Sequence, residues 1–383
     1  MTDRATEPIP LFRIDWTADE VGNAVESITR GSYWANGPYV DEFEAMLADR
    51  MGVDHAVVFN SGTSALVSVL DAAGIGPGDE VIVPSFTFIA TANAVEAVGA
   101  TPVFAEIEPD RYALDVNDVA DRITPATAAL LPIHYAGMPC RIEPLRELAD
   151  AHDLTLIEDA AEAQGATVDG TPVGTFGDAG MLSFCQNKIV ATGEGGAVVT
   201  DDRDLAGRLR RLRSHGRASS DYFDSADTGE YVSLGYNLRM PDVVAGIGVA
   251  QMGRLDDIIE RRRRVALDLT DRLADIAHVH PPRDPEKARG VYQLYTVRFD
   301  DHVDRDGVID ALAERDIASK VYFDPIHLTQ YYRNQYGYTD GHLPRTETIS
   351  GQVLSLPMHP SLSRDSRDRI VAGIRDALER CAQ

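Results

Sequence analysis

One lysine, Lys188, lies between a strand-like run and a cluster of glycines in SFCQNKIVATGEGG, residues 183–196. The chain has only three lysines against thirty-three arginines, so arginine serves as its usual surface cation. A lysine amine attacks a carbonyl only after it has lost its proton, and a partly buried lysine loses that proton readily. The position of Lys188, where a sheet edge meets a loop, therefore favours Schiff-base chemistry over a plain surface cation.

A Gly-Thr-Ser turn joins a strand-like run to a helix-like run in FNSGTSALVSVL, residues 59–70. The start of a helix presents free backbone N–H groups, and the hydroxyls of Thr63 and Ser64 add donors, so the turn suits a phosphate monoester. Plain N-capping by these hydroxyls is an equally good interpretation of the segment alone. The turn matches neither a Walker P-loop nor GxGxxG, which disfavours an ATPase or a nicotinamide-dependent enzyme.

Two carboxylates, Glu158 and Asp159, end the apolar run in LTLIEDAAEAQGA, residues 154–166. A carboxylate at the end of a buried strand is costly unless a cation or a hydrogen-bond donor faces it. A protonated pyridine nitrogen is one such partner, and the carboxylate would hold that ring in its electron-withdrawing form. Capping of a helix after the strand is the alternative role for Asp159.

Phe86 and Phe88 follow another strand-like run in PSFTFIATANAV, residues 84–95. An aromatic side chain at the mouth of a sheet can stack on a flat cofactor ring, although core packing is the ordinary role of such residues. Together with the lysine, the phosphate turn and the buried acid, this segment completes the set of groups that pyridoxal 5′-phosphate (PLP) requires. We therefore expect PLP as the cofactor.

The elements that must position these residues form a mainly parallel α/β sheet with helices on both sides. Seven short apolar runs recur along the chain, and most of them are rich in Val, Ile and Leu without strict polar alternation, as expected for strands buried on both faces. Helix-like segments at 64–74 and 141–153 lie between them and indicate alternating strands and helices. The seven runs cover residues 55–60, 80–86, 101–107, 128–135, 154–160, 179–185 and 195–201.

A second, smaller α+β domain is expected in the C-terminal third. The chain of 383 residues exceeds the size, about 250–300 residues, at which a single hydrophobic core stops growing. We assign residues 1–250 to a large PLP-binding domain and residues 251–383 to a linking helix and a small domain. The segments behind this division are a helical stretch over 242–275, a linker over 278–290, a strand-like run over 291–299, and helices over 304–316 and 363–381.

The net charge of −25 restricts the partners of the protein. Nucleic acid and anionic membranes are polyanions and would be repelled, so we expect neither as a partner. The arginine run 261–264 lies among apolar residues at helical spacing and indicates a solvated helix face. Acid excess with few lysines fits a halophilic protein from a high-salt cytoplasm, where salt screens charge. A merely acidic, GC-rich proteome is the alternative.

Cysteines and histidines indicate neither a disulfide framework nor a metal centre. Cys140, Cys185 and Cys381 are far apart and form no CxxC pair, as expected for reduced thiols in a cytoplasmic protein. The N-terminal sixteen residues show no apolar signal-peptide region, and no run is apolar enough to span a membrane. His278 and His280 alternate like strand positions, but without a carboxylate or a third histidine nearby we expect no metal site.

Eight stretches resemble the DegT-type nucleotide-sugar aminotransferases, within the fold type I PLP enzymes. The resemblance runs from about residue 30 to residue 360. It implies the fold type I architecture and the transamination of a nucleotide-linked keto sugar to an amino sugar, with glutamate as the usual amino donor. The matching stretches are GPYVDEFEAMLA, NSGTSAL, PSFTFIATANAVEAVGATPVF, PIHYAGMPC, IEDAAEAQGA, SFCQNKIVATGEGGAVVT, GYNLRMPDVVAGIGVAQM and PIHLTQYY.

The resemblance assigns roles to the residues that match the motifs of the family. Lys188 resembles the Schiff-base lysine, which also moves a proton during transamination. Asp159 resembles the partner of the pyridinium nitrogen, and Phe88 resembles the ring-stacking aromatic. Asn237 in GYNLRM resembles a residue that reaches the phosphate from the neighbouring subunit, which implies a homodimer with shared active sites. The residues that resemble phosphate ligands are Gly62, Thr63, Ser64 and Ser183.

Glu162 departs from the pattern of many family members, which have glutamine or histidine three residues after the aspartate. A carboxylate near the phenolic oxygen of the cofactor would require a proton on one of the two groups. The EDAAEA and NKxxxTGEGG variants resemble those of sugar C4-aminotransferases, which favours an NDP-4-keto-6-deoxyhexose over 3-keto sugars or cyclitol ketones. Candidate contacts with the sugar or the diphosphate are Arg239, His327 and Tyr331.

Three other functions fit parts of the pattern. A PLP-dependent sugar dehydratase of the same family would have histidine at the lysine position, which Lys188 disfavours. A non-catalytic regulator could keep the cofactor cup, but it need not retain the amine. A scaffold without cofactor would purify as a colourless protein.

Overall fold

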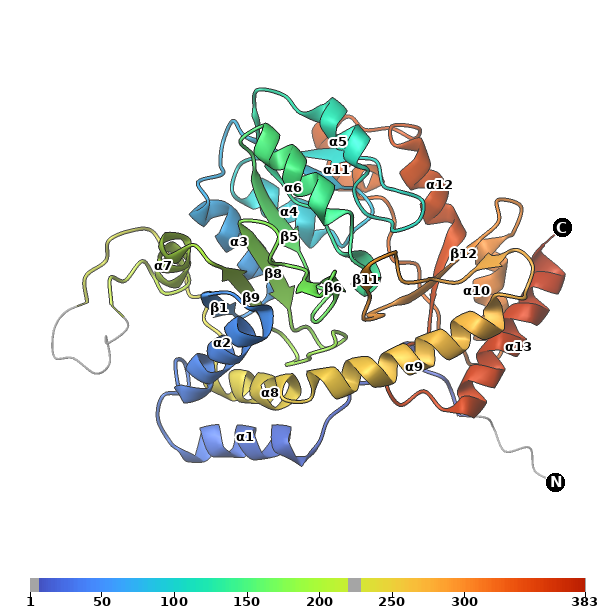
Figure 1. The fold of residues 1–383 in the computed structure, drawn as a ribbon, viewed down its shortest axis with the longest axis horizontal. Coiled ribbons are helices and arrows are strands. Elements are labelled where there is room, and N and C mark those ends of the chain that lie inside the picture. The colour runs from blue at the N-terminus through green and yellow to red at the C-terminus, as the bar shows by residue number, and fades with distance from the viewer. Residues whose placement is uncertain (1–6, 220–228, 383) are drawn as a thin grey trace.

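A seven-stranded sheet forms the centre of the molecule, with helices on both faces (Figure 1). The computed structural model describes residues 7–219 and 229–382, so the first six residues of the N-terminal stretch lie outside the described part. All seven predicted runs form strands of this sheet, and the expected α/β architecture is confirmed. These strands are β1 (His55–Phe59), β2 (Glu80–Pro84), β3 (Thr101–Ala105), β4 (Thr127–Leu130), β5 (Thr155–Asp159), β8 (Ala179–Ser183) and β9 (Gly196–Thr200).

The strand directions bring the candidate segments to one edge of the sheet. The strand order is β1-β9-β8-β5-β4-β2-β3. Strand β9 is antiparallel to both of its neighbours, whereas β8, β5, β4, β2 and β3 are mutually parallel. Consequently β1 runs in the same direction as β8, and the carboxyl ends of β1, β2, β5 and β8 share an edge. Parallel sheets bind their ligands at this edge.

Two apolar cores cover the two faces of the sheet, because successive strand residues point to opposite sides. Ala56 and Val58 of β1 join the core beneath α2, α6 and α8, while Val57 and Phe59 join the core beneath α3, α4 and α7.

The helices are α1 (Ala18–Thr29), α2 (Pro38–Met51), α3 (Gly62–Ala72), α4 (Ala90–Ala97), α5 (Val116–Arg122), α6 (Ile142–Ala151), α7 (Arg203–Leu212), α8 (Asp242–Met252), α9 (Leu255–Leu273), α10 (Arg305–Ala313), α11 (Gln330–Tyr336), α12 (Pro344–Gln352) and α13 (Arg364–Cys381), with 3₁₀ turns η1 (Tyr135–Gly137) and η2 (Ile326–Leu328).

The stretch predicted as helical over 242–275 consists of two helices, α8 and α9, which meet at Gly253 and Arg254. Arg254 has φ −114° and ψ 7°, outside the helical range, so the ladder of helical hydrogen bonds breaks there. Its guanidinium donates to Asp15 at 2.8 Å and to Glu20 at 2.6 Å. These two acids therefore fix the corner between the two helices. Helix α9 then runs from α8 toward α13 (Figure 1).

The arginine run of α9 is only partly a solvated face, which corrects the prediction for residues 261–264. Arg262 is 4% exposed and donates to the main-chain carbonyls of Tyr292 at 2.8 Å and Gln293 at 2.7 Å. Burial lowers the pKa of Arg262 to about 10. The expectation fails at this residue because α9 packs one side of the run against the segment that leads into β12 (Tyr295–Phe299).

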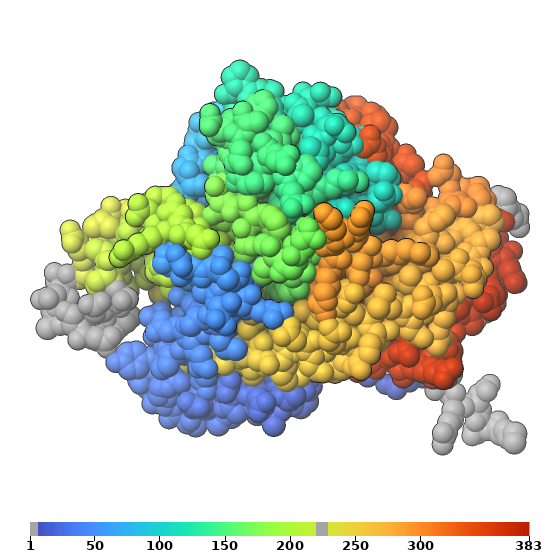
Figure 2. Space-filling model, viewed as in Figure 1, coloured from blue at the N-terminus to red at the C-terminus, as the bar shows by residue number. Residues whose placement is uncertain are grey.

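The C-terminal part of the chain forms its own small sheet and core. Strands β10 (Val279–His280), β12 and β13 (Val353–Leu356) pair in the order β10-β12-β13 and pack with α9, α10 and α13. This core also contains Ile9 and Met138, so the division at residue 250 stays a prediction. Figure 2 shows much of the chain beyond residue 280, in orange and red, at one end of the molecule. Ile326, Tyr332 and Leu343 are the exception, because they pack in the core beneath α3 and α4. The short strands β6 (Thr167–Val168), β7 (Thr171–Pro172) and β11 (Ala288–Arg289) form a third sheet.

Within the described ranges, no helix combines the length and the apolar character that crossing a bilayer requires.

Candidate active site

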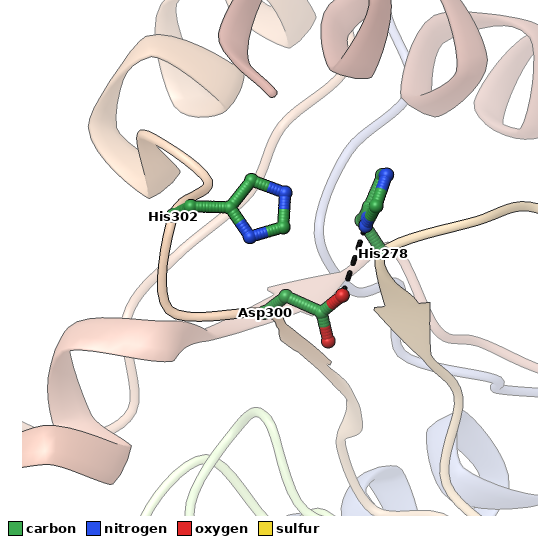
Figure 3. A group of neighbouring side chains, drawn as sticks. All are labelled: His278, Asp300 and His302. Atoms are coloured by element: carbon green, nitrogen blue, oxygen red, sulfur yellow. Dashed lines mark hydrogen bonds and ion pairs between the residues drawn. The ribbon is translucent and has the colours of Figure 1, made fainter. Parts of the chain in front are cut away.

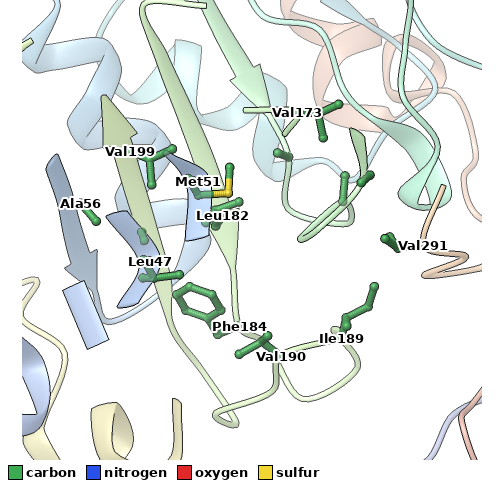
Figure 4. Packing of buried hydrophobic residues seen from close by; sticks show 14 of the residues in the cluster. Leu47, Met51, Ala56, Val173, Leu182, Phe184, Ile189, Val190, Val199 and Val291 are labelled. Atoms are coloured by element: carbon green, nitrogen blue, oxygen red, sulfur yellow. The ribbon is translucent and has the colours of Figure 1, made fainter. Parts of the chain in front are cut away.

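Lys188 lies in the loop between β8 and β9, and its neighbours fasten that loop to the core. Ile189 and Val190 are 3% and 0% exposed and belong to the same apolar core, Val190 beside Phe184 and Ile189 on the side of Val291 (Figure 4). The Lys188 side chain itself is 13% exposed, and its Nζ lies 3.1 Å from Oε1 of Glu162. The amine is thus largely shielded from solvent and lies within hydrogen-bonding distance of a carboxylate.

Glu162 uses both of its carboxylate oxygens inside the protein. Oε1 accepts the bond from Lys188, and Oε2 accepts a 2.8 Å bond from the backbone N–H of Ala136 in η1. Its side chain is 5% exposed. The structure therefore gives Glu162 a cation and an amide as partners, and its predicted place near the phenolic oxygen of the cofactor stays a prediction.

Asp159 ends β5 as a buried acid, 3% exposed. Its Oδ2 accepts a 2.9 Å bond from the Thr91 hydroxyl of α4, and its Oδ1 accepts a 3.2 Å bond from the backbone N–H of Ala161. Burial raises the pKa of Asp159, and the nearby charge of Lys188 opposes that rise. Residues 160–166 form turns and no helix, so the alternative role of Asp159 as a helix cap is wrong.

Glu158, the neighbour of Asp159, anchors the end of the same strand. Its fully buried carboxylate accepts bonds from the backbone N–H groups of Gly174 at 2.7 Å, Phe176 at 2.7 Å and Gly177 at 2.8 Å, and from His134 Nε2 at 2.8 Å. His134 Nδ1 accepts a 3.2 Å bond from a backbone N–H, so its Nε2 bears the proton donated to Glu158. Four donors thus hold the strand end that positions Asp159.

A cradle forms where the start of α3 meets the end of β8. Ser61 is the N-cap of α3, and its Oγ accepts a 3.0 Å bond from the backbone N–H of Ser64. A Cβ added to Gly62 would lie 3.0 Å from the Cβ and 3.1 Å from the Oγ of Ser183, so that hydroxyl faces the first turn of the helix. Thr63 is exposed on the same turn. The N-cap of the helix is therefore Ser61, and the alternative of capping by Thr63 and Ser64 is wrong, because both residues lie inside the first turn.

The segment that contains Asn237 runs beside this cradle. Asn237 pairs with Ser214 through an isolated β-bridge, and the backbone N–H of Asn60 donates to the carbonyl of Leu238 at 2.9 Å. Asn60 directly precedes Ser61, so residues 237–239 lie next to the turn that starts α3. The structure thus places Asn237 near the phosphate turn of its own chain, and its predicted reach into a neighbouring subunit stays a prediction.

The two phenylalanines after β2 have different environments. Phe86 is fully buried, and its ring centroid lies 5.1 Å from that of Tyr135. Phe88 is 58% exposed, with its ring 6.1 Å from that of Phe323. Core packing is therefore the role of Phe86, whereas the exposed face of Phe88 is open to a flat ligand.

The three candidate substrate contacts form their hydrogen bonds with residues other than Lys188 and Glu162. His327 is fully buried, with Nδ1 2.7 Å from the Ser85 hydroxyl and Nε2 3.1 Å from a Glu347 carboxylate oxygen. Tyr331 is 53% exposed on α11. Arg239 donates to the Ser214 hydroxyl at 3.0 Å. Their roles toward a sugar or a diphosphate stay predictions.

Arg239 lines a cavity of about 1010 Å³ that is rich in arginine. Burial, together with the charges of Arg217 and Arg213, lowers the pKa of Arg239. Glu44 compensates part of this charge, because it forms an ion pair with Arg213. The arginines that line the cavity are Arg210, Arg211, Arg213, Arg217 and Arg239.

Two features of these residues fit PLP: the types of their functional groups, and the space between Gly62 and Ser183. The cradle between Gly62 and Ser183 leaves room that a single Cβ would fill, beside the N–H groups of a helix start, as a phosphate requires. Asp159 is a buried carboxylate, which a pyridinium nitrogen would relieve of its desolvation cost. Sequence reasoning missed Thr91, since nothing in a local pattern marks a hydroxyl that contacts an acid 68 residues later.

Curated relatives match nearly the whole chain. GDP-perosamine synthase of Caulobacter vibrioides is 40% identical over 89% of this chain and 91% of its own length. Spore coat polysaccharide biosynthesis protein SpsC of Bacillus subtilis is 36% identical over 94% of this chain and 95% of its own length.

Solved structures match the fold with the same completeness. DesV of S. venezuelae has a TM-score of 0.90 and 37% identity, and covers 97% of this chain and 98% of its own. The PLP form of the putative sugar aminotransferase Spr1654 of Streptococcus pneumoniae has a TM-score of 0.92 and 27% identity, and covers 98% of this chain and 99% of its own.

The profile of the DegT/DnrJ/EryC1/StrS aminotransferase family matches residues 16–375. This match, the full-length relatives and the PLP-form neighbour agree with the cradle, the buried acid and the amine of the site, and the cofactor is PLP. The chain belongs to the DegT/DnrJ/EryC1/StrS aminotransferase family.

Proposed function

We propose that this PLP-dependent sugar aminotransferase acts on an NDP-4-keto-6-deoxyhexose and takes its amino group from glutamate. The observation that carries the proposal is the Lys188 amine, which is 13% exposed and lies at the carboxyl edge of the sheet with the buried Asp159 nearby. The names of the relatives support the substrate class, since one is a GDP-perosamine synthase and another a UDP-4-amino-4-deoxy-L-arabinose–oxoglutarate aminotransferase, 34% identical over 97% of this chain.

The side chains of the site have separate chemical tasks. PLP, when bound, supplies an electron sink that stabilises negative charge on the carbon next to the transferred nitrogen. Lys188 supplies the amine and carries a proton at Nζ to and from the reacting carbon. Asp159 holds the positive charge of the ring nitrogen, and Thr91 and Ala161 hold Asp159 in place.

Glu162 orients the lysine between these proton transfers. Its Oε1 receives the ammonium form of Lys188, and the bond from Ala136 to Oε2 fixes the carboxylate. A carboxylate fixed in this way directs one N–H bond of Nζ toward Oε1. The hydrogen bond also restricts the long lysine side chain to few rotamers.

An anionic substrate is supported by the arginine-rich cavity next to Asn237. In a chain with net charge −25, a cavity of about 1010 Å³ lined, among the described residues, by five arginines and only two acids, Asp41 and Glu44, has a local positive field. Guanidinium groups bind the oxygens of phosphates in a bidentate way, so the wall suits a diphosphate. Arg239 is the member closest in sequence to Asn237.

A homodimer with shared sites is supported by apolar side chains exposed beside Asn237. Leu234 is 72% exposed and Tyr231 is 55% exposed, and Trp34, at 57%, lines the cavity on the same side. Exposed aromatic and aliphatic groups of this kind mark protein interfaces. The family resemblance of Asn237 implies that its side chain reaches the phosphate in a second copy of the chain.

A cytoplasmic location is part of the same proposal. The free cysteines of the described residues, Cys140, Cys185 and Cys381, suit a reducing compartment.

A panel of nucleotide-linked 4-keto and 3-keto sugars, incubated with the enzyme, PLP and glutamate, tests the reaction. Mass spectrometry should show replacement of the keto oxygen by an amine only with the 4-keto sugars, together with 2-oxoglutarate. Lys188→Ala should abolish turnover, whereas Lys287→Ala, which removes an exposed lysine, should leave it unchanged. Normal turnover by Lys188→Ala, or a deoxy product with release of ammonia, would contradict the proposal.

Mixing two inactive variants tests the shared sites. Lys188→Ala removes the amine, and Asn237→Asp places a like charge near the phosphate. If each site combines Lys188 of one chain with Asn237 of the other, random hybrids contain one intact site, and activity should return to about one quarter of wild type. No recovery in hybrids that have formed, as confirmed by native mass spectrometry, would contradict shared sites.

A further inference from the structure

Three side chains of the small C-terminal sheet form a cluster remote in sequence from the active-site motifs. The His–Asp–His cluster consists of His278, Asp300 and His302 (Figure 3). His278 directly precedes β10, and the other two residues follow β12. The antiparallel pairing of Val279 with Phe299 brings these two segments to the same end of the sheet. A bond from the backbone N–H of Asp300 to the carbonyl of His278, at 3.2 Å, closes this end.

The ligand-capable atoms of the cluster are close enough to share one ion. His278 Nδ1 lies 2.9 Å from Asp300 Oδ2, and one such atom from each of the three residues lies within 4.8 Å of the others. The rings of His278 and His302 have centroids 4.6 Å apart at an angle of 84°. Metal–nitrogen and metal–oxygen bonds of about 2.0–2.2 Å place two ligands of one tetrahedral ion roughly 3–4 Å apart. Small side-chain rotations therefore suffice for coordination.

We propose that His278, Asp300 and His302 bind one divalent transition-metal ion, with Zn²⁺ as the best fit. Two imidazole nitrogens and one carboxylate oxygen form a ligand set that zinc accepts, whereas Mg²⁺ and Ca²⁺ prefer sites made of oxygen. The cluster borders a surface hollow of about 440 Å³ lined by Asp300 and His302, which leaves space for water on the remaining coordination positions.

His280 supports the carboxylate of this site from its other side. Its Nε2 lies 2.6 Å from Asp300 Oδ1, so Oδ2 is the oxygen left to the ion. A hydrogen bond of this kind fixes the orientation of a metal-binding carboxylate. Arg298, which also lines the hollow, donates to the carbonyl of Pro109 at 3.1 Å, and Asp301 accepts a bond from Gln352. Arg298 and Asp301, two further charged residues that line the hollow, thus have partners of their own.

The pairing of β10 with β12 supplies the ligands that the local sequence lacks. The prediction of no metal at His278 and His280 rested on the absence of a carboxylate and of a third histidine nearby. Asp300 lies 22 residues after His278 and 20 after His280 along the chain, and only the folded sheet brings Asp300 and His302 into contact with them. An ion here would cross-link the segment after α9 to the turn before α10. It would stabilise the small sheet and leave the rate of the aminotransferase reaction unchanged.

Titration of ZnCl₂ into the PLP-loaded enzyme in chelator-free buffer, followed by calorimetry, tests the site. Wild type should bind one more ion per chain than His302→Ala, or bind at least about tenfold more tightly. His302→Ala leaves the acidic charge of the chain unchanged, so loss of binding cannot arise from weaker attraction to a polyanionic surface. The matched controls, His152→Ala at an exposed histidine elsewhere and Asp301→Asn beside the cluster, should bind as wild type does.

Equal zinc binding by wild type and His302→Ala would overturn the proposal, as would displacement of zinc by an equal concentration of CaCl₂. A second readout is the thermal midpoint, which zinc should raise in wild type and in both controls but not in His302→Ala. Aminotransferase turnover should be the same in all four proteins without added zinc, which separates failure of the metal site from failure of the proposed reaction.

Discussion

Asp159 shows at the scale of one residue how a functional group is maintained at a cost in stability. A buried carboxylate with one hydroxyl and one amide as donors is less well solvated than in water, and for this reason its pKa is raised. The pyridinium nitrogen of PLP is the cation that this environment lacks. We therefore expect Asp159 to cost less free energy in the PLP-loaded enzyme than in the cofactor-free chain.

Replacing Asp159 by asparagine should separate stability from activity. Because the folded, cofactor-free protein holds the Asp159 proton more tightly than the unfolded chain, the contribution of this group to stability falls as pH rises from 3.8 through the raised pKa. The free energy of unfolding of Asp159→Asn lacks this decrease with pH, because the amide does not titrate. At neutral pH the cofactor-free variant should therefore unfold at a higher urea concentration than wild type. Turnover should drop about 10²- to 10³-fold, the cost of removing a preorganised electrostatic contact.

The control for this substitution is Asp71→Asn, at an exposed position of α3, which should change the free energy of unfolding by no more than about 0.5 kcal/mol. Wild-type turnover by Asp159→Asn would rule out the assigned partnership with the ring nitrogen.

The two hydrogen bonds of Glu162 explain why a carboxylate occupies a position where many family members have glutamine or histidine. It faces the ammonium of Lys188 on one oxygen and the N–H of Ala136 on the other, and a glutamine could offer only one acceptor oxygen for these two donors. The carboxylate therefore satisfies both buried groups at once.

Helix α3 is the element that forms the proposed phosphate side of the site. Ser61 caps the helix through the Ser64 N–H, which leaves the first turn pointing at the end of β8. Gly62 is the residue that permits this close approach, because any Cβ there would meet Ser183 at 3.0–3.1 Å. The absence of a side chain is thus what lets two elements share one ligand.

Gly62→Ala should weaken PLP binding by about tenfold or more, because the added methyl group would occupy the cradle and displace the Ser183 hydroxyl. Titration of PLP into the cofactor-free protein, followed by its absorbance, measures the dissociation constant. Gly22→Ala is the matched control, since a Cβ at Gly22 of α1 meets nothing within 4 Å. The control should bind PLP normally and gain up to about 1 kcal/mol of stability from helix propensity. Unchanged affinity in Gly62→Ala would refute the cradle.

Charge dominates at the scale of the whole molecule. The net charge of −25 is spread over a surface on which acids outnumber bases, although many arginines form ion pairs with them. Mutual repulsion of the excess carboxylates destabilises the compact state, and salt weakens that repulsion because the Debye length falls from about 10 Å at 0.1 M to about 3 Å at 1 M.

We expect the protein to be halophilic in its stability. The thermal midpoint should rise steadily between about 0.1 M and 2 M KCl as the repulsion is screened. Sucrose at matched osmolality is the control, since it favours compact states by exclusion without screening charge. A midpoint that is equal in dilute buffer and in molar KCl would favour the alternative of a merely acidic proteome.

The sequence by itself determined the sheet and most of the chemistry. Buried strands need apolar residues on both faces, so all seven runs were visible in the local composition. Lys188 and Asp159 could be proposed as site residues for a similar reason, because an amine and a buried acid are conspicuous at the end of an apolar strand. The break at Gly253 could not be seen, because the contacts of Arg254 with distant acids decide it.

Only the tertiary structure decided which groups meet. The pairing of Lys188 with Glu162, the bond from Thr91 to Asp159, and the approach of Asp300 to His278 join residues that are 22 to 68 positions apart. Periodicity and composition report whether a residue is buried, but not which distant residue lies against it. That choice depends on strand order and direction, which are properties of the whole sheet.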